Sequence, residues 1–222
     1  FWVYLVNKEL KQRIISSIVL IPLVFFCILM GSYIFSLLIF ISFIITLYEW
    51  NKMIQSKILV FLGSIYLLFA YLTVFMIRNN FGIDSVYYFF LIILICISTD
   101  IGGYIFGKII KGPKLGFISP NKTYAGFIGG IIMTIIMVLL FVNFIYSFNI
   151  DKSKVNLVFL LFVFLISIVS QIGDLIISYF KRLSNIKDTG NIIPGHGGLL
   201  DRTDGMVFAF PFSYILLTLK VF

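Results

Sequence analysis

Residues 155–180 read VNLVFLLFVFLISIVSQIGDLIISYF, an apolar run with one acidic residue, Asp174. A helix needs about 20 mostly apolar residues to cross the ~30 Å hydrocarbon core of a bilayer, and this run is long enough. Burying a carboxylate within such a helix costs at least about 2 kcal/mol, so we expect a cation or another partner beside Asp174. The run therefore predicts a membrane-spanning helix with a functional position inside it.

Similar apolar runs recur along the whole chain. Its 222 residues are 61% hydrophobic and only 12% charged, with a mean hydropathy of +1.11, which excludes an ordinary soluble domain. We predict an all-α, polytopic integral membrane protein with a single membrane-embedded domain over residues 1–222, whose functional motifs lie in 95–222. About seven spans are expected, at 14–30, 33–48, 59–77, 86–106, 124–148, 155–180 and 203–219.

The basic residues predict how these spans are oriented. Successive loops between the spans lie on opposite sides of the membrane. Most basic residues fall on one side, and the other side holds only Arg78, Lys152, Lys154 and Lys220. By the positive-inside rule the basic side is cytoplasmic, which places the N-terminus inside and the protein in the cytoplasmic (inner) membrane as a multi-pass protein. The net charge of +8 then reflects orientation rather than nucleic-acid binding. Cys27 and Cys96 lie in apolar runs, which excludes a disulfide framework.

The acidic residues form two groups. Glu9, Glu49, Asp84 and Asp151 fall at span ends or in loops, where we expect them to be solvated. The others gather around the two longest cytoplasmic loops, and they are Asp100, Asp174, Asp188, Asp201 and Asp204.

Two readings remain open for the acids that fall inside apolar helices, Asp100 and Asp174. They could form structural ion pairs with Lys108 or Lys181. They could instead help to bind a metal, and carboxylate oxygens suit magnesium. Asp201 and Asp204 are three residues apart and share a helix face, so they could join Asp174 around one cavity.

The first cytoplasmic loop, residues 107–123, combines helix-breaking glycine and proline with four lysines. Ser119 and Thr123 come just ahead of the helix predicted from residue 124. Hydroxyl groups at a helix N-terminus suit a phosphate group. The same pattern is also typical of an ordinary helix cap.

The second loop is richer in charge. Lys181, Arg182, Lys187 and Arg202 lie close to three acids and to His196, the only histidine. Gly195, Gly197 and Gly198 allow the backbone to approach a ligand closely. Carboxylates that hold magnesium, next to cations that neutralise phosphate oxygens, are typical of phosphoryl-type transfer. His196 could be a general base, but phosphate esters are already anionic at neutral pH, so phosphate contact or loop structure is the favoured role.

Residues 178–204 resemble the signature of the phosphatidate cytidylyltransferases, or CDP-diacylglycerol synthases. That signature runs Ser-x-apolar-Lys-Arg, then Lys-Asp, then Pro-x-His-Gly-Gly, and ends in Asp-Arg-x-Asp. The similarity extends to 171–175, 98–107 and 119–126, and more weakly to Tyr48-Glu49. The chain departs from the family at Asn121, where Lys is common, and at Ala125, where Glu is common. It is also short for the family, which leaves room for an N-terminal helix or two.

The resemblance implies that CTP and phosphatidate are converted to CDP-diacylglycerol and pyrophosphate, at a site that faces the cytoplasm. It implies that Asp174 and Asp201 bind Mg²⁺, with Asp204 and Asp188 as further ligands or supports. A second cation could bind nearby. Cationic groups near the phosphates would be Lys122, Lys181, Arg182, Lys187 and Arg202. Substrate-binding positions would be Ser119, Lys122, Thr123, Gly197, Gly198 and Asp100. Expected partners are both substrates and membrane lipid, with no nucleic acid and with a homodimer as an open prediction.

Two alternatives to this reading remain. A CTP-dependent polyprenol or lipid kinase is also polytopic, but it would release CDP instead of pyrophosphate. An ion-coupled transporter could use Asp100 and Asp174 to carry protons or sodium. Transporters usually show repeated halves and charges at the membrane midplane, whereas here the acids gather at one side.

Overall fold

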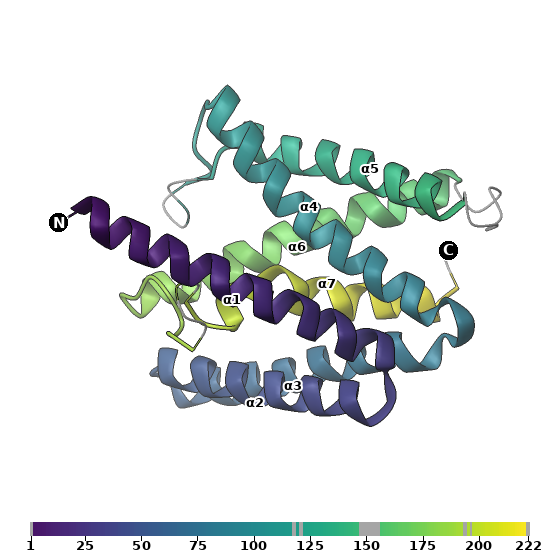
Figure 1. Cartoon of the computed structure of the whole chain (residues 1–222), viewed down its shortest axis with the longest axis horizontal. Coiled ribbons are helices and arrows are strands. Elements are labelled where there is room, and N and C mark those ends of the chain that lie inside the picture. Colours follow the sequence, from purple (N-terminus) through teal and green to yellow (C-terminus); the bar gives the residue numbers. More distant parts are fainter. Residues whose placement is uncertain are drawn as a thin grey trace. The chain divides into compact units, whose positions relative to one another are not determined.

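The structure, a computed structural model, describes residues 2–116, 119, 122–146, 156–192, 195 and 197–220 (Figure 1). These residues form seven α-helices and one short 3₁₀ helix, with an isolated bridge between Lys114 and Thr123 as their only β-type pairing. The elements are α1 (Trp2–Met30), α2 (Ser32–Met53), α3 (Lys57–Asn80), η1 (Gly82–Asp84), α4 (Ser85–Ile110), α5 (Tyr124–Tyr146), α6 (Leu157–Leu183) and α7 (Leu200–Thr218). Each α-helix overlaps one predicted span, so the all-α prediction is confirmed.

Five of the helices, α2 to α6, are long and apolar enough to cross a membrane. The apolar part of α1, Ile14–Met30, is shorter. Between 17% and 44% of each apolar window is buried inside the protein, and the rest of each window is partly or fully exposed. A surface this apolar is stable only in contact with lipid, because water would have to hydrate it at a cost proportional to its area.

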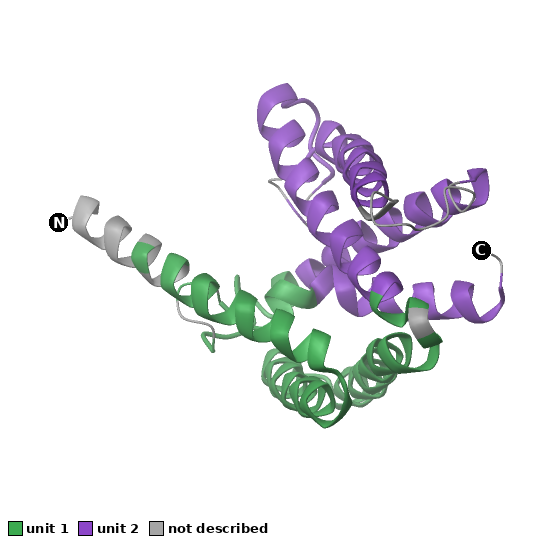
Figure 2. Cartoon of the chain, turned by 45° about the vertical axis from the view of Figure 1, so that its right-hand side comes forward, with its two compact units in different colours: residues 1–86, 180–203 green, residues 87–179, 204–222 purple. Residues whose placement is uncertain are grey.

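The chain divides into two compact units, which Figure 2 colours separately. Unit 1 comprises residues 1–86 and 180–203, and unit 2 comprises residues 87–179 and 204–222. The expectation of one membrane-embedded domain stays a prediction.

In unit 1, α2 and α3 lie side by side, and α1 packs on α2 (Figure 1). The turn between α1 and α2 is held by Arg78, whose Nε donates to the carbonyl oxygen of Ile28 at 2.8 Å. A cation at this point satisfies a free carbonyl and opposes the negative end of the α1 dipole. Near the other end of α2, the ring of Trp50 packs edge-on against Phe180, with 5.1 Å between ring centroids.

In unit 2, glycines let α4 and α5 approach closely. A Cβ added at Gly126 would lie 2.7 Å from the carbonyl oxygen of Gly103, so only glycine fits there. Deeper in the unit, the hydroxyl of Thr99 lies 2.8 Å from that of Thr134 and 3.0 Å from that of Ser167. Such small and hydroxyl-bearing residues join helices where apolar side chains alone give little preference for protein over lipid. They fix the walls of the cavity described below.

Candidate active site

In unit 1, the loop between α6 and α7 surrounds the carboxylate of Asp201. Lys181 donates to Asp201 Oδ1 at 2.8 Å, and the two side chains are only 11% and 8% exposed. The other oxygen, Oδ2, accepts the backbone N–H of Thr189 at 2.7 Å and that of Gly198 at 3.1 Å. The Thr189 hydroxyl also lies 3.0 Å from Oδ2. The Asp201 carboxylate is therefore held in place from both sides by short, charge-assisted contacts.

These contacts set the ionisation of Asp201, which lies in the first turn of α7 outside its apolar segment. Burial by itself raises the pKa of Asp201, because a charged carboxylate loses hydration. The hydrogen bond and charge of Lys181 and the backbone N–H donors of Thr189 and Gly198 outweigh burial, and the net pKa lies below the ordinary 3.8. Asp201 is therefore a carboxylate at neutral pH.

Glu49 corrects a prediction from the sequence. We expected it to be solvated at the end of a span, but its side chain is 0% exposed. Its Oε1 accepts the backbone N–H of Leu199 at 2.9 Å, and its Oε2 accepts that of Leu200 at 2.8 Å. The Thr189 hydroxyl lies 3.1 Å from Oε2. The expectation failed because free N–H groups at the start of a helix can replace water around a buried carboxylate.

The remaining predicted residues of this loop are more open. The side chains of Arg182, Lys187, Asp188 and Arg202 are exposed. Gly197 has φ +89°, a conformation that favours glycine, and lies beside Asp201 and Asp188. His196 lies outside the described residues, so its predicted role stays a prediction. Lys181, one of the predicted cations of this loop, contacts Asp201.

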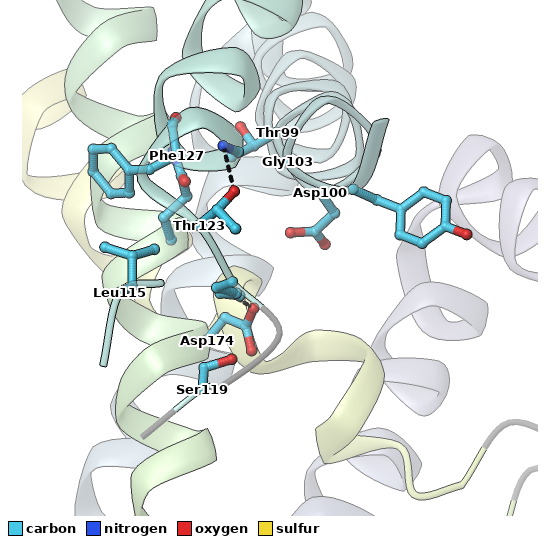
Figure 3. Close-up of a pocket in the computed structure, with 12 residues that line it drawn as sticks. Thr99, Asp100, Gly103, Leu115, Ser119, Thr123, Phe127 and Asp174 are labelled. Carbon is cyan, nitrogen blue, oxygen red and sulfur yellow. Dashed lines mark hydrogen bonds and ion pairs between the residues drawn. The ribbon is translucent and has the colours of Figure 1, made fainter. Parts of the chain in front are cut away.

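Unit 2 contains a cavity of about 320 Å³, walled by α4, α5, α6 and the loop before α5 (Figure 3). Several residues predicted from the first loop and from the helices line it. The lining residues include Asp100, Ser119, Lys122, Thr123, Gln171 and Asp174. The cavity thus brings together positions that are far apart in the sequence.

Asp174 and Lys122 form an ion pair at this cavity. The sequence named Lys108 and Lys181 as structural partners for the buried acids, and for Asp174 the partner is Lys122 instead. Lys181 pairs with Asp201, and Lys108 lies over the ring of Tyr104, 5.7 Å from its centroid. Ser178, one helical turn after Asp174, donates to its Oδ1 at 3.4 Å, as expected from their shared face.

Two further carboxylates interact with Asp174. The charge of Asp174 acts on both Asp204 and Asp100. Figure 3 shows the carboxyl groups of Asp100 and Asp174 directed toward the same space. Carboxylates at such close range are stable together only when a proton or a cation offsets their repulsion. Lys122, which pairs with Asp174, also acts on the charge of Asp100.

This donor set is compatible with magnesium. Mg²⁺ takes oxygen ligands and commonly binds through one or two carboxylates together with substrate phosphates. Asp174 and Asp204 supply such a pair. Among the described residues, no group of three or more His, Cys, Asp or Glu side chains is arranged to hold a metal by itself. Substrate phosphates would have to complete the coordination.

Thr123 forms a helix cap, which the sequence left open as the alternative to phosphate binding by the first loop. Its hydroxyl accepts the backbone N–H of Gly126 at 3.0 Å, as an N-cap residue does at the start of a helix, here α5. The side chain is 9% exposed and lines the cavity. Ser119 also lines the cavity, and its backbone carbonyl accepts the N–H of Lys122 at 3.1 Å. The cap and the cavity wall are therefore one and the same segment.

Comparison with known proteins gives the family. The model of the cytidylyltransferase family matches residues 11–82 and 55–220. The phosphatidate cytidylyltransferase of Rickettsia bellii (strain RML369-C) is 36% identical over 215 residues, which cover 95% of this chain and 91% of that protein. That of Rickettsia conorii (strain ATCC VR-613 / Malish 7) is 34% identical over 97% of this chain and 93% of its own length.

This chain belongs to the cytidylyltransferase family. The family resemblance inferred from residues 178–204 is thereby confirmed. The share of each relative that aligns with this chain differs. The phosphatidate cytidylyltransferase of Staphylococcus aureus (strain COL) is 46% identical over 61% of this chain and 50% of its own length. The chain spans about nine tenths of its rickettsial relatives and half of the staphylococcal one.

Sequence reasoning missed some members of the site of this cytidylyltransferase. Glu49 was expected to be solvated and was noted besides only in the weak family match at Tyr48-Glu49. A second signal was available, since an acid beside an apolar run is costly unless it has partners. Gln171, which lines the cavity and donates to the carbonyl oxygen of Phe127 at 3.3 Å, was noted only as part of the family-like segment 171–175. Thr189 carried no signal in the sequence.

Proposed function

We propose that this chain is a phosphatidate cytidylyltransferase, which transfers the cytidylyl group of CTP to phosphatidate. The products are CDP-diacylglycerol and pyrophosphate. The observation that carries the proposal is the alignment with the Rickettsia bellii protein of that name over 95% of this chain. The apolar helices support it, because the acyl chains of the lipid substrate can remain in hydrocarbon while its phosphate meets a water-soluble nucleotide.

The chemistry follows from the groups present. A phosphate oxygen of phosphatidate attacks the α-phosphorus of CTP, an O–P bond forms, and the bond to the β-phosphate oxygen breaks with release of pyrophosphate. Both reactants are anionic, so positive charge lowers the barrier by offsetting their repulsion. Lys181 in unit 1, which is 11% exposed, can supply it with little screening by water, and Lys122 in unit 2, which is 33% exposed, with more screening. No general base is required, because the attacking oxygen already carries charge.

We propose Mg²⁺ as the cofactor. Asp174 and Asp204 would hold it in unit 2, and the family motif nominates Asp201 and Asp188 as further ligands, with a second cation left open. Bound magnesium would supply charge neutralisation on the phosphate oxygens. The exposed Arg182, Lys187 and Arg202 remain predicted phosphate contacts, as does His196.

The finer membrane arrangement is also a proposal. We infer seven spans with the N-terminus in the cytoplasm, in the cytoplasmic (inner) membrane, with the site opening to the cytoplasm. The distribution of basic residues supports this orientation. A homodimer stays an open prediction that the mass of the purified protein in detergent would decide.

The test uses CTP that is labelled in turn at the α- and the γ-phosphate, with phosphatidate in mixed micelles. The proposal predicts that the α-label appears in the lipid product and the γ-label in pyrophosphate. A lipid kinase would instead place the γ-label in the lipid and leave the α-label in CDP. That second pattern, or no lipid labelling at all, would contradict the proposed function.

A further inference from the structure

A buried acid outside the predicted site holds the loop that carries Asp201. Glu49 is fully buried near the end of α2, and its carboxylate accepts hydrogen bonds from two backbone N–H groups and one hydroxyl. Among the described residues, no lysine or arginine forms an ion pair with Glu49. Its charge is therefore stabilised by the start of α7, where free N–H groups and the helix dipole favour an anion.

The fit around Glu49 is close on both sides of the loop. A Cβ added at Gly190 would lie 2.8 Å from Glu49 Oε1, and one added at Gly198 would lie 2.7 Å from Oε2. Both distances are shorter than real Cβ contacts. Glycine at these two positions allows the backbone to close over the carboxylate, so Glu49 fixes two segments of the loop at once.

The same two segments supply the donors to Asp201. The backbone N–H groups of Thr189 and Gly198 both donate to Asp201 Oδ2. The Thr189 hydroxyl lies 3.1 Å from Glu49 Oε2 and 3.0 Å from Asp201 Oδ2, so it has one hydrogen for two carboxylates. Removing the Glu49 charge would therefore loosen the groups that hold Asp201 without touching Asp201 itself.

We propose that Glu49 is a positioning residue for the cytidylyl transfer reaction. It anchors the start of α7 and residues 189–190, and through them it fixes the Asp201–Lys181 pair. The inference rests on the proposed function and adds to it a residue from the N-terminal half of the chain, where the family signature is weakest. Glu49 acts on the reaction through Asp201, not by contact with substrate.

The test compares purified wild-type protein with Glu49→Gln, which keeps the size of the side chain but removes its charge and turns one acceptor into a donor. We expect kcat to fall roughly 10- to 100-fold, as when a group that orients a metal ligand is lost. The KM for phosphatidate should change little. Hydrogen exchange should speed up at the amides of Leu199 and Leu200 in the variant.

Three further variants make the outcome decisive. Thr189→Val should lower kcat and Thr189→Ser should restore it, which keeps the test valid if Glu49→Gln does not fold. Asp84→Asn, at an exposed acid outside the site, should behave as wild type. Inactive wild-type protein would contradict the proposed function. Active wild type with kcat within about twofold in Glu49→Gln and Thr189→Val, or unchanged exchange at Leu199 and Leu200, would overturn the role of Glu49.

Discussion

Asp201 shows how single contacts decide the chemistry available to a carboxylate. Burial alone would favour its neutral form, yet Lys181, the two Thr189 groups and the Gly198 N–H together favour the anion. Its pKa in the folded protein lies below the ordinary 3.8. The ionised Asp201 therefore stabilises the folded protein fully above pH 3.8. This stabilisation is lost as the pH falls through the lower pKa that Asp201 has in the folded protein.

Lys181→Met tests this account of Asp201. Loss of one charged hydrogen bond costs about 1.5–3 kcal/mol, so we expect roughly a 10- to 100-fold loss of kcat/KM at neutral pH. Without the lysine, its hydrogen bond and its charge no longer lower the pKa of Asp201, so that pKa rises. The acidic limb of the pH profile of residual activity should accordingly move to higher pH.

A matched control for that variant is Lys52→Met, which removes an exposed lysine at the end of α2. Its pH profile should overlay that of the wild type. If the acidic limb of Lys181→Met also stayed in place, Lys181 would not control the ionisation of Asp201.

At the level of single residues, the sequence predicted which residues carry the chemistry better than it predicted which residues contact one another. The intramembrane position of Asp174 called for a partner, and the structure supplies Lys122, which lies 52 positions away. No local pattern joins these two residues, because their pairing depends on how α6 meets the loop before α5. Glu49 was misjudged for the same reason, since its donors come from residues 189–200.

Among the helices, the packing of α4 on α5 is the feature that shapes the cavity. A Cβ at Gly102 would lie 2.8 Å from the carbonyl oxygen of Gly129 and 2.5 Å from the Cβ of Met133. At the neighbouring Gly103, the nearest atom would be 3.6 Å away, an ordinary contact. Adjacent glycines on one helix therefore differ in what they tolerate.

Gly102→Ala should separate α4 from α5 and destabilise the protein by about 1–3 kcal/mol, the usual cost of overpacking. Gly103→Ala should be neutral or stabilise slightly, because alanine favours helix over glycine by up to about 1 kcal/mol. Thermal unfolding in detergent would measure both. Equal melting temperatures for the two variants would show that the α4–α5 contact is looser than described.

The helices themselves were predictable from the sequence, because apolar runs of membrane length have few other stable structures. Each predicted span overlaps one helix. The ends differ: α1 begins at Trp2 instead of 14, and α2 continues from the predicted end at 48 to Met53 and so includes Glu49. The polar residues at that end are stabilised by tertiary contacts of Trp50 and Glu49, which hydropathy does not detect.

For the whole molecule, the distribution of basic residues predicts which loops share a side of the membrane. Reporter fusions after Lys57 and after Lys187 should both behave as cytoplasmic. A fusion after Arg78 should behave as external, because its loop holds a single basic residue. Fusions after Arg78 and Lys187 that report the same side would contradict an odd number of spans.

The central claim is that an intramembrane carboxylate, Asp174, serves cytidylyl transfer between CTP and phosphatidate. The most direct measurement compares purified wild-type protein with Asp174→Asn in the formation of CDP-diacylglycerol, with magnesium present and with matched melting temperatures. We expect one pyrophosphate per CDP-diacylglycerol in the wild type, and a loss of activity of at least about 100-fold in the variant, since charge placed at the reacting phosphates is worth several kcal/mol. Turnover of Asp174→Asn near that of the wild type would contradict it.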